Sequence, residues 1–382
     1  MPVCRPEDHP PPAPTPRPAD VRVGIVGYGL AGRVFHGRLL AVTPGVRVVA
    51  VVTRDPDRQA QARADLPGVR VYAELSAALR AGLDLVVIAT PNATHPALAA
   101  QALQAGVATV VDKPLAVTAA DATRLVELAG AQGVPLTVFQ NRRWDADVLT
   151  LVDAARAGRL GQIRRFESRF ERWRPHLDAG KWREVAPAES GGGILVDLGS
   201  HLVDQALHLF GDVTAVYAEV DARRGGADDD VFLALTHGCG VRSHLWCSAV
   251  AGSPGPRMRV SGSAGALVVQ ELDGQEAALR AGRRADQADR PVVRLVRGPQ
   301  EEALPAAAGR WSGFYPAVVA AVRGQGPVPV DPYDAVRCLQ VLEAARRSAA
   351  TGGIVRPSVP GGTQTAEVGR LARWTPRRPD VR

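Results

Sequence analysis

Lysine and asparagine are almost absent from this sequence. Of its 46 basic residues, 44 are arginine and two, Lys113 and Lys181, are lysine; asparagine occurs only at Asn92 and Asn141. A GC-rich coding sequence gives such a bias, because it places arginine wherever a plain positive charge suffices. A retained lysine is then a candidate for chemistry that arginine does not perform, since an ammonium can lose its proton at accessible pH and a guanidinium cannot.

Long apolar runs and paired cysteines are also missing. The longest apolar stretches are strand-sized, far below the roughly 20 residues of a membrane helix, and no apolar segment follows the early arginine as a secretory signal requires. Four scattered cysteines without a C-x-x-C pair indicate neither a disulfide framework nor a metal site. We therefore expect a cytoplasmic protein with no membrane partner and no metal.

The net charge of +7 is concentrated at the C-terminus. Six arginines against two acidic residues leave +4 on residues 356–382, and the remainder shows no basic stripe interleaved with aromatics. We expect a solvated basic tail over residues 351–382 and no nucleic-acid partner. At the other end, residues 1–19 are proline-rich without apolar periodicity, which predicts a disordered arm.

Between these ends, two patterns predict two domains. Over residues 20–140, short apolar strands alternate with helices, which predicts an α/β Rossmann domain with a parallel sheet. Over residues 141–350, strand-like runs follow one another without intervening helices. They predict an α+β domain with an open, mainly antiparallel sheet, closed by helices at about 312–322 and 332–349.

A glycine-rich turn follows the first predicted strand. It reads Gly27-Tyr-Gly-Leu-Ala-Gly32 and matches G-x-G-x-x-G between a strand and a helix, the context that marks a dinucleotide site. The first glycine permits the tight turn, the second lets the pyrophosphate approach, and the third lets the helix pack closely. The cofactor contacts expected here are Gly27, Gly29, Leu30, Ala31 and Gly32.

The end of the second strand bears on the choice of cofactor. A site that prefers NAD usually has an acidic residue there, whereas this chain has Thr53 and Arg54. A guanidinium pairs with a 2′-phosphate and a hydroxyl donates to it, so NADP is favoured. The alternative is NAD, with Arg54 a solvated turn residue and Asp55 serving the ribose.

Further polar residues follow strands at the same sheet edge. We expect Thr90, Asn92 and His95 to contact the nicotinamide ribose or to shape the cleft; the segment also reads as a turn before a helix. We also expect Asp112 and Lys113 to contact the cofactor, because they follow a nearly all-apolar strand that places the lysine at the cleft floor.

A second cluster supplies candidate catalytic groups. Three glycines at 191–193 lead into a helix on which Asp197 and His201 lie four residues apart, so they share a face. Hydride transfer from an alcohol carbon needs a base for the hydroxyl proton and a cation or donor for the oxyanion. Neutral His201 suits the first role and Lys113 the second, while Asp197 orients the imidazole or binds substrate. The alternative is that His201 has only a structural role, which is the usual one for a single histidine on an amphipathic helix.

Two segments combine hydrogen-bond donors with flat side chains, as polyol sites do. They are residues 141–145 and 172–176, and both are equally consistent with a domain interface. The substrate contacts expected from these segments and from the helix are Asn141, Arg142, Trp144, Arg174, Asp197 and His201.

Three motifs in order resemble the Gfo/Idh/MocA oxidoreductases. They are Gly27–Gly32, Asp112-Lys113-Pro114, and G-G-G-x-L-x-D-x-G-x-H-x-x-D at 191–204. Residues 27–37, 141–145 and 273–282 resemble the NADP-dependent scyllo-inositol dehydrogenase branch. The resemblance implies catalytic Lys113 with Asp197 and His201, and an open sheet used for homodimer or homotetramer contacts. Where the family usually has Glu, this chain has Asp112, one methylene shorter.

These observations predict an NADP(H)-dependent oxidoreductase. It would transfer hydride between the nicotinamide and a secondary alcohol or ketone of a cyclic polyol, with scyllo-inositol and scyllo-inosose as the favoured pair. One alternative is an NAD(P)-dependent dehydrogenase of an aldose or another sugar. Another is a non-catalytic NADP-sensing protein, which we expect to lack the lysine or the histidine that this chain retains.

Overall fold

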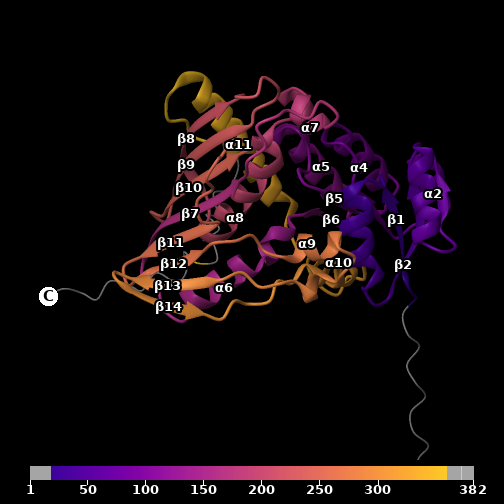
Figure 1. Ribbon diagram of the computed structural model, residues 1–382. Coiled ribbons are helices and arrows are strands. Elements are labelled where there is room, and N and C mark those ends of the chain that lie inside the picture. Colours follow the sequence, from indigo (N-terminus) through magenta and orange to yellow (C-terminus); the bar gives the residue numbers. More distant parts are fainter. Residues whose placement is uncertain (1–18, 359–370, 372–382) are drawn as a thin grey trace, which may run out of the picture.

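Two β-sheets with flanking helices make up the protein (Figure 1). The computed structural model describes residues 19–358 and residue 371. No helix within these residues is both long and apolar enough to cross a membrane.

The first sheet is parallel throughout and has the strand order β3-β2-β1-β4-β5-β6. This order reverses between β1 and β4, and ligands of such sheets bind outside the carboxyl ends of the strands at that point. The central strands are buried on both faces, which is why they read as unbroken apolar runs. The strands are β1 (Val21–Val26), β2 (Val46–Val52), β3 (Arg70–Tyr72), β4 (Leu85–Ile88), β5 (Ala108–Asp112) and β6 (Leu136–Phe139).

Helices connect these strands, and their ends follow from local sequence. Asp55 caps α2 by accepting hydrogen bonds from the next helical N–H groups, with Pro56 in the first turn. Thr118 caps α5, which ends at Gly133 in the left-handed conformation. The helices of this part are α1 (Arg38–Ala41), α2 (Pro56–Asp65), α3 (Leu75–Arg80), α4 (His95–Gln104) and α5 (Ala119–Gln132).

The second sheet has eight strands in the order β14-β13-β12-β11-β7-β10-β9-β8. Only the β7–β10 pair is parallel, so the sheet is mainly antiparallel, as predicted. Its strands are β7 (Ile163–Glu171), β8 (Val213–Asp221), β9 (Asp230–His237), β10 (Arg242–Ser248), β11 (Met258–Gly262), β12 (Ala266–Val269), β13 (Val293–Arg297) and β14 (Gln300–Leu304).

One face of this sheet is covered and the other is open. Buried and partly exposed residues alternate along β9 and β10, the pattern of a sheet with one solvated face. The buried residues share a core with helices α6 (Ala146–Arg156) and α8 (Ser200–Phe210). The covered, inner face therefore looks toward α8, and the outer face is open.

The C-terminal helices differ from the sequence-based expectation. Both were expected to close the second domain, but α10 (Phe314–Val322) packs on the first sheet (Figure 1). Phe314 and Tyr315 share a buried core there with Val23 of β1 and Leu39 of α1. The last helix, α11 (Pro332–Thr351), packs against α5, α8 and β8 and so spans both parts.

Ordered contacts also continue past the expected boundary at residue 350. Val355 exchanges two backbone hydrogen bonds with Val216 of β8, at 2.8 and 2.9 Å. Leu371 is buried, and its N–H donates to the Leu209 carbonyl at 2.8 Å. Val355 and Leu371 of the expected solvated tail are therefore packed on the domain. Residues 359–370 and 372–382 of that tail and residues 1–18 of the arm lie outside the described residues.

Candidate active site

The glycine-rich turn can be built only with glycine at two of its three positions. Gly27 has φ +88°, and a Cβ there would lie 2.5 Å from the Ala89 carbonyl oxygen. A Cβ on Gly32 would lie 2.0 Å from the Gly27 oxygen. A Cβ on Gly29, in contrast, would meet nothing nearer than the flexible Arg58 guanidinium at 3.8 Å. The backbone is open where a pyrophosphate approaches, so the turn fits a dinucleotide.

Leu30 precedes a π-helix over Ala31–Gly37, which continues into α1. The Gly29 carbonyl accepts the N–H of Arg33 at 2.9 Å, which joins the turn to the helix. The free N–H groups of this helix start lie at the carboxyl edge of the first sheet, the usual place for a phosphate. This arrangement agrees with the motif interpretation.

At the end of β2, the acidic residue and the basic residue have different partners. Asp55 accepts hydrogen bonds from the N–H groups of Asp57 and Arg58 at the start of α2. Arg54 is exposed and pairs with Glu74 at 2.5 Å. Thr53 is buried, and its hydroxyl accepts the Asp55 N–H at 3.3 Å. The Asp55 carboxylate is therefore occupied by the helix, and Arg54 remains at the surface.

Arg58 lies at the candidate cofactor site and was not predicted from the sequence. It pairs with Asp55 at 3.3 Å and lies beside Gly29, so a second guanidinium stands between β2 and the glycine-rich turn. Its position in the first turn of α2, four residues after Arg54, could have predicted that it lies near the same site.

His95 has a structural role, which corrects the expectation that it touches the cofactor. It is 1% exposed, and its two ring nitrogens contact the carbonyl oxygens of Pro114 at 2.8 Å and Thr90 at 2.9 Å. No nitrogen is left for a ligand, so His95 fixes the loops after β4 and β5. Buried Asn92 also joins segments, by donating to the Gly191 carbonyl at 2.9 Å.

Lys113 follows β5 and reaches the second domain. Its Nζ donates to the Asp197 Oδ1 at 2.8 Å and to the Asp197 backbone carbonyl at 2.5 Å. Arg183, which the sequence analysis did not name, contacts the same Oδ1 through Nε at 3.4 Å. Burial opposes ionisation of Asp197, but Lys113 and Arg183 lower its pKa to about 2. The Asp112 carboxylate accepts the Lys113 backbone N–H at 2.9 Å.

His201 lies in α8 and is buried. Its ring stands edge-on to Phe170 with centroids 6.2 Å apart, and its Nδ1 is shielded from solvent without a hydrogen-bond partner among the described residues. Burial lowers the pKa of His201 well below its usual value, and the charges of Lys113, Arg142 and Arg257 add to the effect. A neutral imidazole has one N–H donor and one acceptor nitrogen.

Asp197 does not orient His201, which corrects one of its two expected roles. Within the part of the chain that the structure describes, the Asp197 carboxylate binds Lys113 and Arg183 and makes no hydrogen bond to the imidazole. Residues Leu195–Gly199 form a π-helix, in which hydrogen bonds join residues five apart. The four-residue spacing therefore does not place the two side chains over one another.

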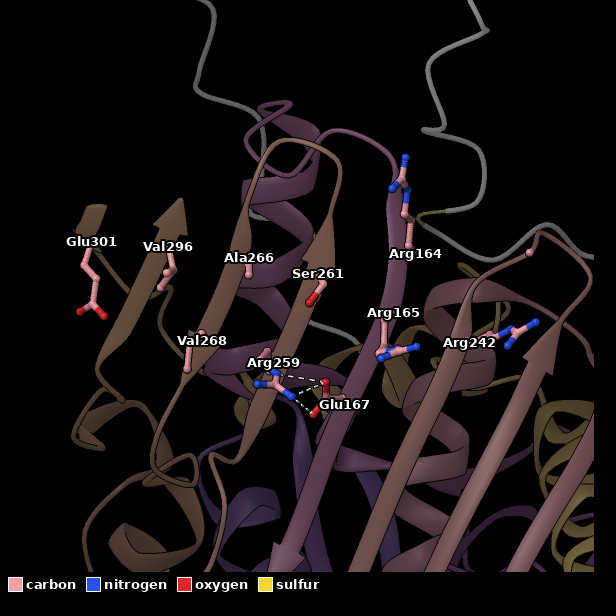
Figure 2. A pocket seen from close by; sticks show the side chains of 11 residues that line it. Arg164, Arg165, Glu167, Arg242, Arg259, Ser261, Ala266, Val268, Val296 and Glu301 are labelled. Atoms are coloured by element: carbon pink, nitrogen blue, oxygen red, sulfur yellow. Dashed lines mark hydrogen bonds and ion pairs between the residues drawn. The ribbon is translucent and has the colours of Figure 1, made fainter. Parts of the chain in front are cut away.

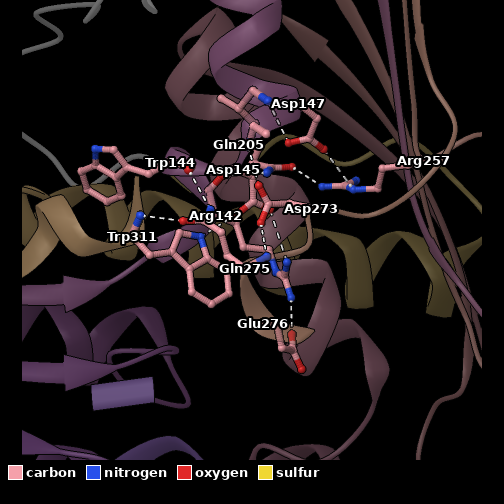
Figure 3. Close-up of polar contacts among 12 residues, drawn as sticks. Arg142, Trp144, Asp145, Asp147, Gln205, Arg257, Asp273, Gln275, Glu276 and Trp311 are labelled. Carbon is pink, nitrogen blue, oxygen red and sulfur yellow. Dashed lines mark hydrogen bonds and ion pairs between the residues drawn. The ribbon is translucent and has the colours of Figure 1, made fainter. Parts of the chain in front are cut away.

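Residues 141–145 form the interface that was the alternative interpretation. The terminal nitrogens of Arg142 bind Asp145 at 3.3 Å and Glu276 at 2.8 Å, and the guanidinium lies 5.7 Å from the Trp311 ring centroid (Figure 3). These contacts join the start of the second domain to α9 (Gln275–Arg280) and to the segment before α10. Arg142 is thus buried with both terminal nitrogens bound, while its Nε has no hydrogen-bond partner among the described residues. Its contact with substrate stays a prediction.

The remaining expected substrate contacts are scattered. The Trp144 ring packs on Phe314 at 5.9 Å, in the core of the first sheet, so it too is an interface residue. Asn141 is buried. Arg174 is exposed, and its backbone N–H donates to the Ala249 carbonyl at 2.7 Å. The structure thus brings together Lys113 and Asp197 at the sheet edge, with His201 in the adjoining helix.

A groove of about 920 Å³ lies elsewhere, on the outer face of the second sheet (Figure 2). Arginines dominate its lining, and Arg259 is paired with Glu167 at 2.7 Å. The groove residue Arg165 alternates along β7 with inward-facing Phe166. The groove is therefore on the opposite side of the sheet from α8 and His201.

Comparison with known proteins places this chain in a family. A family model described as an oxidoreductase family with an NAD-binding Rossmann fold matches residues 21–140, and the GFO/IDH/MocA C-terminal domain matches residues 148–268. The chain therefore belongs to the GFO/IDH/MocA family of NAD(P)-dependent oxidoreductases. The predicted family and fold class are confirmed.

Individual relatives match over most of their length. The uncharacterized oxidoreductase YdgJ of Escherichia coli strain K12 is 38% identical, with 86% of this chain and 96% of that protein covered. The scyllo-inositol 2-dehydrogenase (NADP(+)) IolW of Bacillus subtilis strain 168 is 34% identical, with 86% and 93% covered. The solved structure of Bacillus subtilis YvaA matches with a TM-score of 0.82 at 31% identity, covering 90% of this chain and all of that one.

Proposed function

We propose that this protein is an NADP(H)-dependent dehydrogenase of a cyclic polyol, with scyllo-inositol and scyllo-inosose as the substrate pair. The observation that carries the proposal is the Lys113 ammonium, held by Asp197 at the sheet edge where the glycine-rich turn binds its dinucleotide, with neutral His201 in the adjoining helix. The name of the IolW relative supports the choice of polyol and cofactor.

In the proposed mechanism, Lys113 binds the reacting oxygen. The bound nicotinamide supplies the hydride acceptor or donor. The Lys113 ammonium donates a hydrogen bond to the substrate oxygen and stabilises the negative charge that develops on it. Asp197, ionised because its pKa is about 2, holds the ammonium in place.

His201 would relay the proton. Because burial keeps the imidazole neutral, its acceptor nitrogen can take the hydroxyl proton during oxidation. Because the pKa of His201 is lowered, the imidazolium that forms releases its proton readily. In the reducing direction the proton returns to the substrate oxygen by the same route.

Two arginines support NADP over NAD. The Asp55 carboxylate is bound to the start of α2, whereas Arg54 and Arg58 carry positive charge on both sides of it. The Arg54–Glu74 pair is exposed, and such pairs contribute about 0–1 kcal/mol, so a 2′-phosphate displaces the carboxylate at little cost.

We also propose a homodimer or homotetramer that pairs the outer faces of the second sheet. The rings of Phe232 on β9 and Trp246 on β10 lie 5.1 Å apart on this face, and the Arg169 guanidinium lies 3.8 Å from the Trp246 ring centroid. One end of the face carries Arg165 and Arg242.

At the opposite end, Asp221 and Asp230 are register partners on β8 and β9, and Arg223 pairs with both, at 2.7 and 3.8 Å. A two-fold axis through the aromatic rings would bury Phe232 and Trp246 against the same residues of the partner. Light scattering on wild type and on Trp246→Glu tests this. We expect an oligomer that dissociates in the variant; a monomeric wild type would contradict the proposal.

A substrate panel tests the catalytic proposal. Purified protein with NADP⁺ is assayed against scyllo-inositol, other inositols and aldoses, and in reverse with scyllo-inosose and NADPH. We expect the highest kcat/KM for the scyllo-inositol pair. Efficient turnover of aldoses alone would replace the substrate and keep the chemistry.

A further inference from the structure

We infer that Arg172 is a specificity-determining residue, whose guanidinium binds two adjacent hydroxyl oxygens of the substrate next to the reacting carbon. This inference rests on the proposed function, since it specifies how the same site holds a polyol. It assigns a binding role to a side chain that the fold leaves without a partner.

The register between α8 and β7 positions Arg172. The helix crosses the inner face of the strand in the opposite direction, and two ring contacts mark the register: Phe166 with Phe210 at 5.3 Å, and Phe170 with His201 at 6.2 Å. Arg172 lies two residues beyond Phe170, and this antiparallel register places it toward the start of the helix, where Asp197 lies. The two groups act on each other: Asp197 acts to raise the pKa of Arg172, and Arg172 acts to lower the pKa of Asp197.

The backbone of Arg172 is fixed at this point. Its N–H donates to the Ser248 carbonyl at 3.0 Å, and its carbonyl accepts the Ala251 N–H at 3.2 Å. The side chain is on the same face as inward-facing Phe170, two residues earlier. Arg172 is thus anchored at the carboxyl end of β7 and directed toward the catalytic helix.

The guanidinium of Arg172 has no partner. Among residues 19–358, none accepts a hydrogen bond from it or forms an ion pair with it, and its Nε is shielded from solvent. Burial lowers the pKa of Arg172 and Arg174 lowers it further, while Asp197 acts in the opposite direction. A shielded donor without an acceptor is rare in folded proteins and indicates a missing ligand.

The chemistry beside Arg172 selects hydroxyl groups over an anion. Lys113 and Arg183 share the Oδ1 atom of Asp197, and within the described chain no residue binds its Oδ2. A free carboxylate oxygen next to a free guanidinium offers one acceptor and several donors. Adjacent hydroxyls satisfy both groups because each hydroxyl accepts and donates, whereas an ionised carboxylate or phosphate group has no donor for the Asp197 Oδ2.

Three variants test the inference. Arg172→Met removes the hydrogen-bond donors, and Arg172→Lys keeps the charge without the planar fork. Arg174→Met removes the neighbouring exposed arginine, which is the other guanidinium that could bind the substrate. Arg80→Met, an exposed arginine at the end of α3, is the control. The assays are kcat and KM for scyllo-inosose, the rate with cyclohexanone (a ketone without neighbouring hydroxyls), and the Kd of NADPH by fluorescence.

We expect Arg172→Met to lower kcat/KM for scyllo-inosose by about 10²-fold, the effect of losing two hydrogen bonds from a charged donor. The cyclohexanone rate and the NADPH Kd should stay within about twofold, Arg172→Lys should recover less than about a tenth of the loss, and Arg80→Met should match wild type.

Two results overturn the inference while the proposed function stands: equal losses with both ketones, or a loss in Arg174→Met and not in Arg172→Met. If wild type reduces neither ketone and binds no polyol in its NADPH complex, the proposed function fails, and this inference fails with it.

Discussion

Replacing Lys113 is the strongest perturbation of the proposed chemistry. Its Nζ makes two hydrogen bonds to Asp197, at 2.5 and 2.8 Å, and its side chain is 12% exposed. An arginine keeps the charge, but its fork is larger than the ammonium and does not fit the same point. We expect Lys113→Arg and Lys113→Met to lose at least about 10²–10³-fold in kcat, the usual effect of removing one oxyanion donor.

The fold should survive this change. Arg183 still contacts Asp197 in the variants, so the carboxylate is not left unpaired, and the loss of unfolding free energy should stay below the roughly 3–5 kcal/mol of an isolated buried charge. The NADPH Kd, measured by fluorescence, should stay within about threefold of wild type because Lys113 lies outside the glycine-rich turn.

The second lysine provides a matched control. Lys181 pairs with Asp178 at 2.6 Å, and its side chain is 55% exposed. Lys181→Arg should therefore change neither kcat nor stability measurably. Steady-state nicotinamide absorbance reports all three variants. A Lys113→Arg enzyme with near wild-type kcat would refute the assignment of Lys113 as the group that stabilises the alkoxide.

Three further predictions concern the cofactor and stability. Arg54→Ala should raise KM for NADP⁺ about tenfold or more and leave that for NAD⁺ unchanged; equal effects on both in steady-state assays would exclude a 2′-phosphate contact. Gly32→Ala should abolish dinucleotide binding in calorimetry, because its Cβ would lie 2.0 Å from a backbone oxygen. The control Gly130→Ala, in open space on α5, should bind normally. Burial lowers the pKa of His36 and His237 to about 4, so the unfolded state takes up protons first as the pH falls below about 6.5. Denaturant titrations should then show roughly 2 kcal/mol lost per histidine between pH 7 and pH 5; equal stability at both pH values would contradict this.

The strands and helices of the first sheet could be predicted from the sequence because each depends on a short local pattern. Apolar runs buried on both faces, the glycine-rich turn and the Asp55 cap each depend on a few adjacent residues. The placement of α10 was not readable, because an apolar helix fits either core equally well. Only the tertiary structure shows that Phe314 and Tyr315 cover the first sheet.

The sequence predicted which residues belong to the candidate site, but not which of them contact one another. Lys113 stood out because this composition rarely keeps a lysine, and the structure places it on Asp197. The π-helix at Leu195–Gly199 is invisible to a pattern that assumes ordinary helical spacing, so the expected Asp197–His201 contact was wrong. His95 shows the same limit, since its two carbonyl partners come from separate loops.

Comparing NADP⁺ and NAD⁺ reduction by scyllo-inositol with the purified protein tests the proposed function most directly. Absorbance of the reduced nicotinamide is followed with both cofactors at equal concentration. We expect rapid reduction of NADP⁺ and little or none of NAD⁺. Reduction of NAD⁺ alone would contradict the role of Arg54, and reduction of neither, with scyllo-inosose also inert toward NADPH, would contradict the polyol assignment itself.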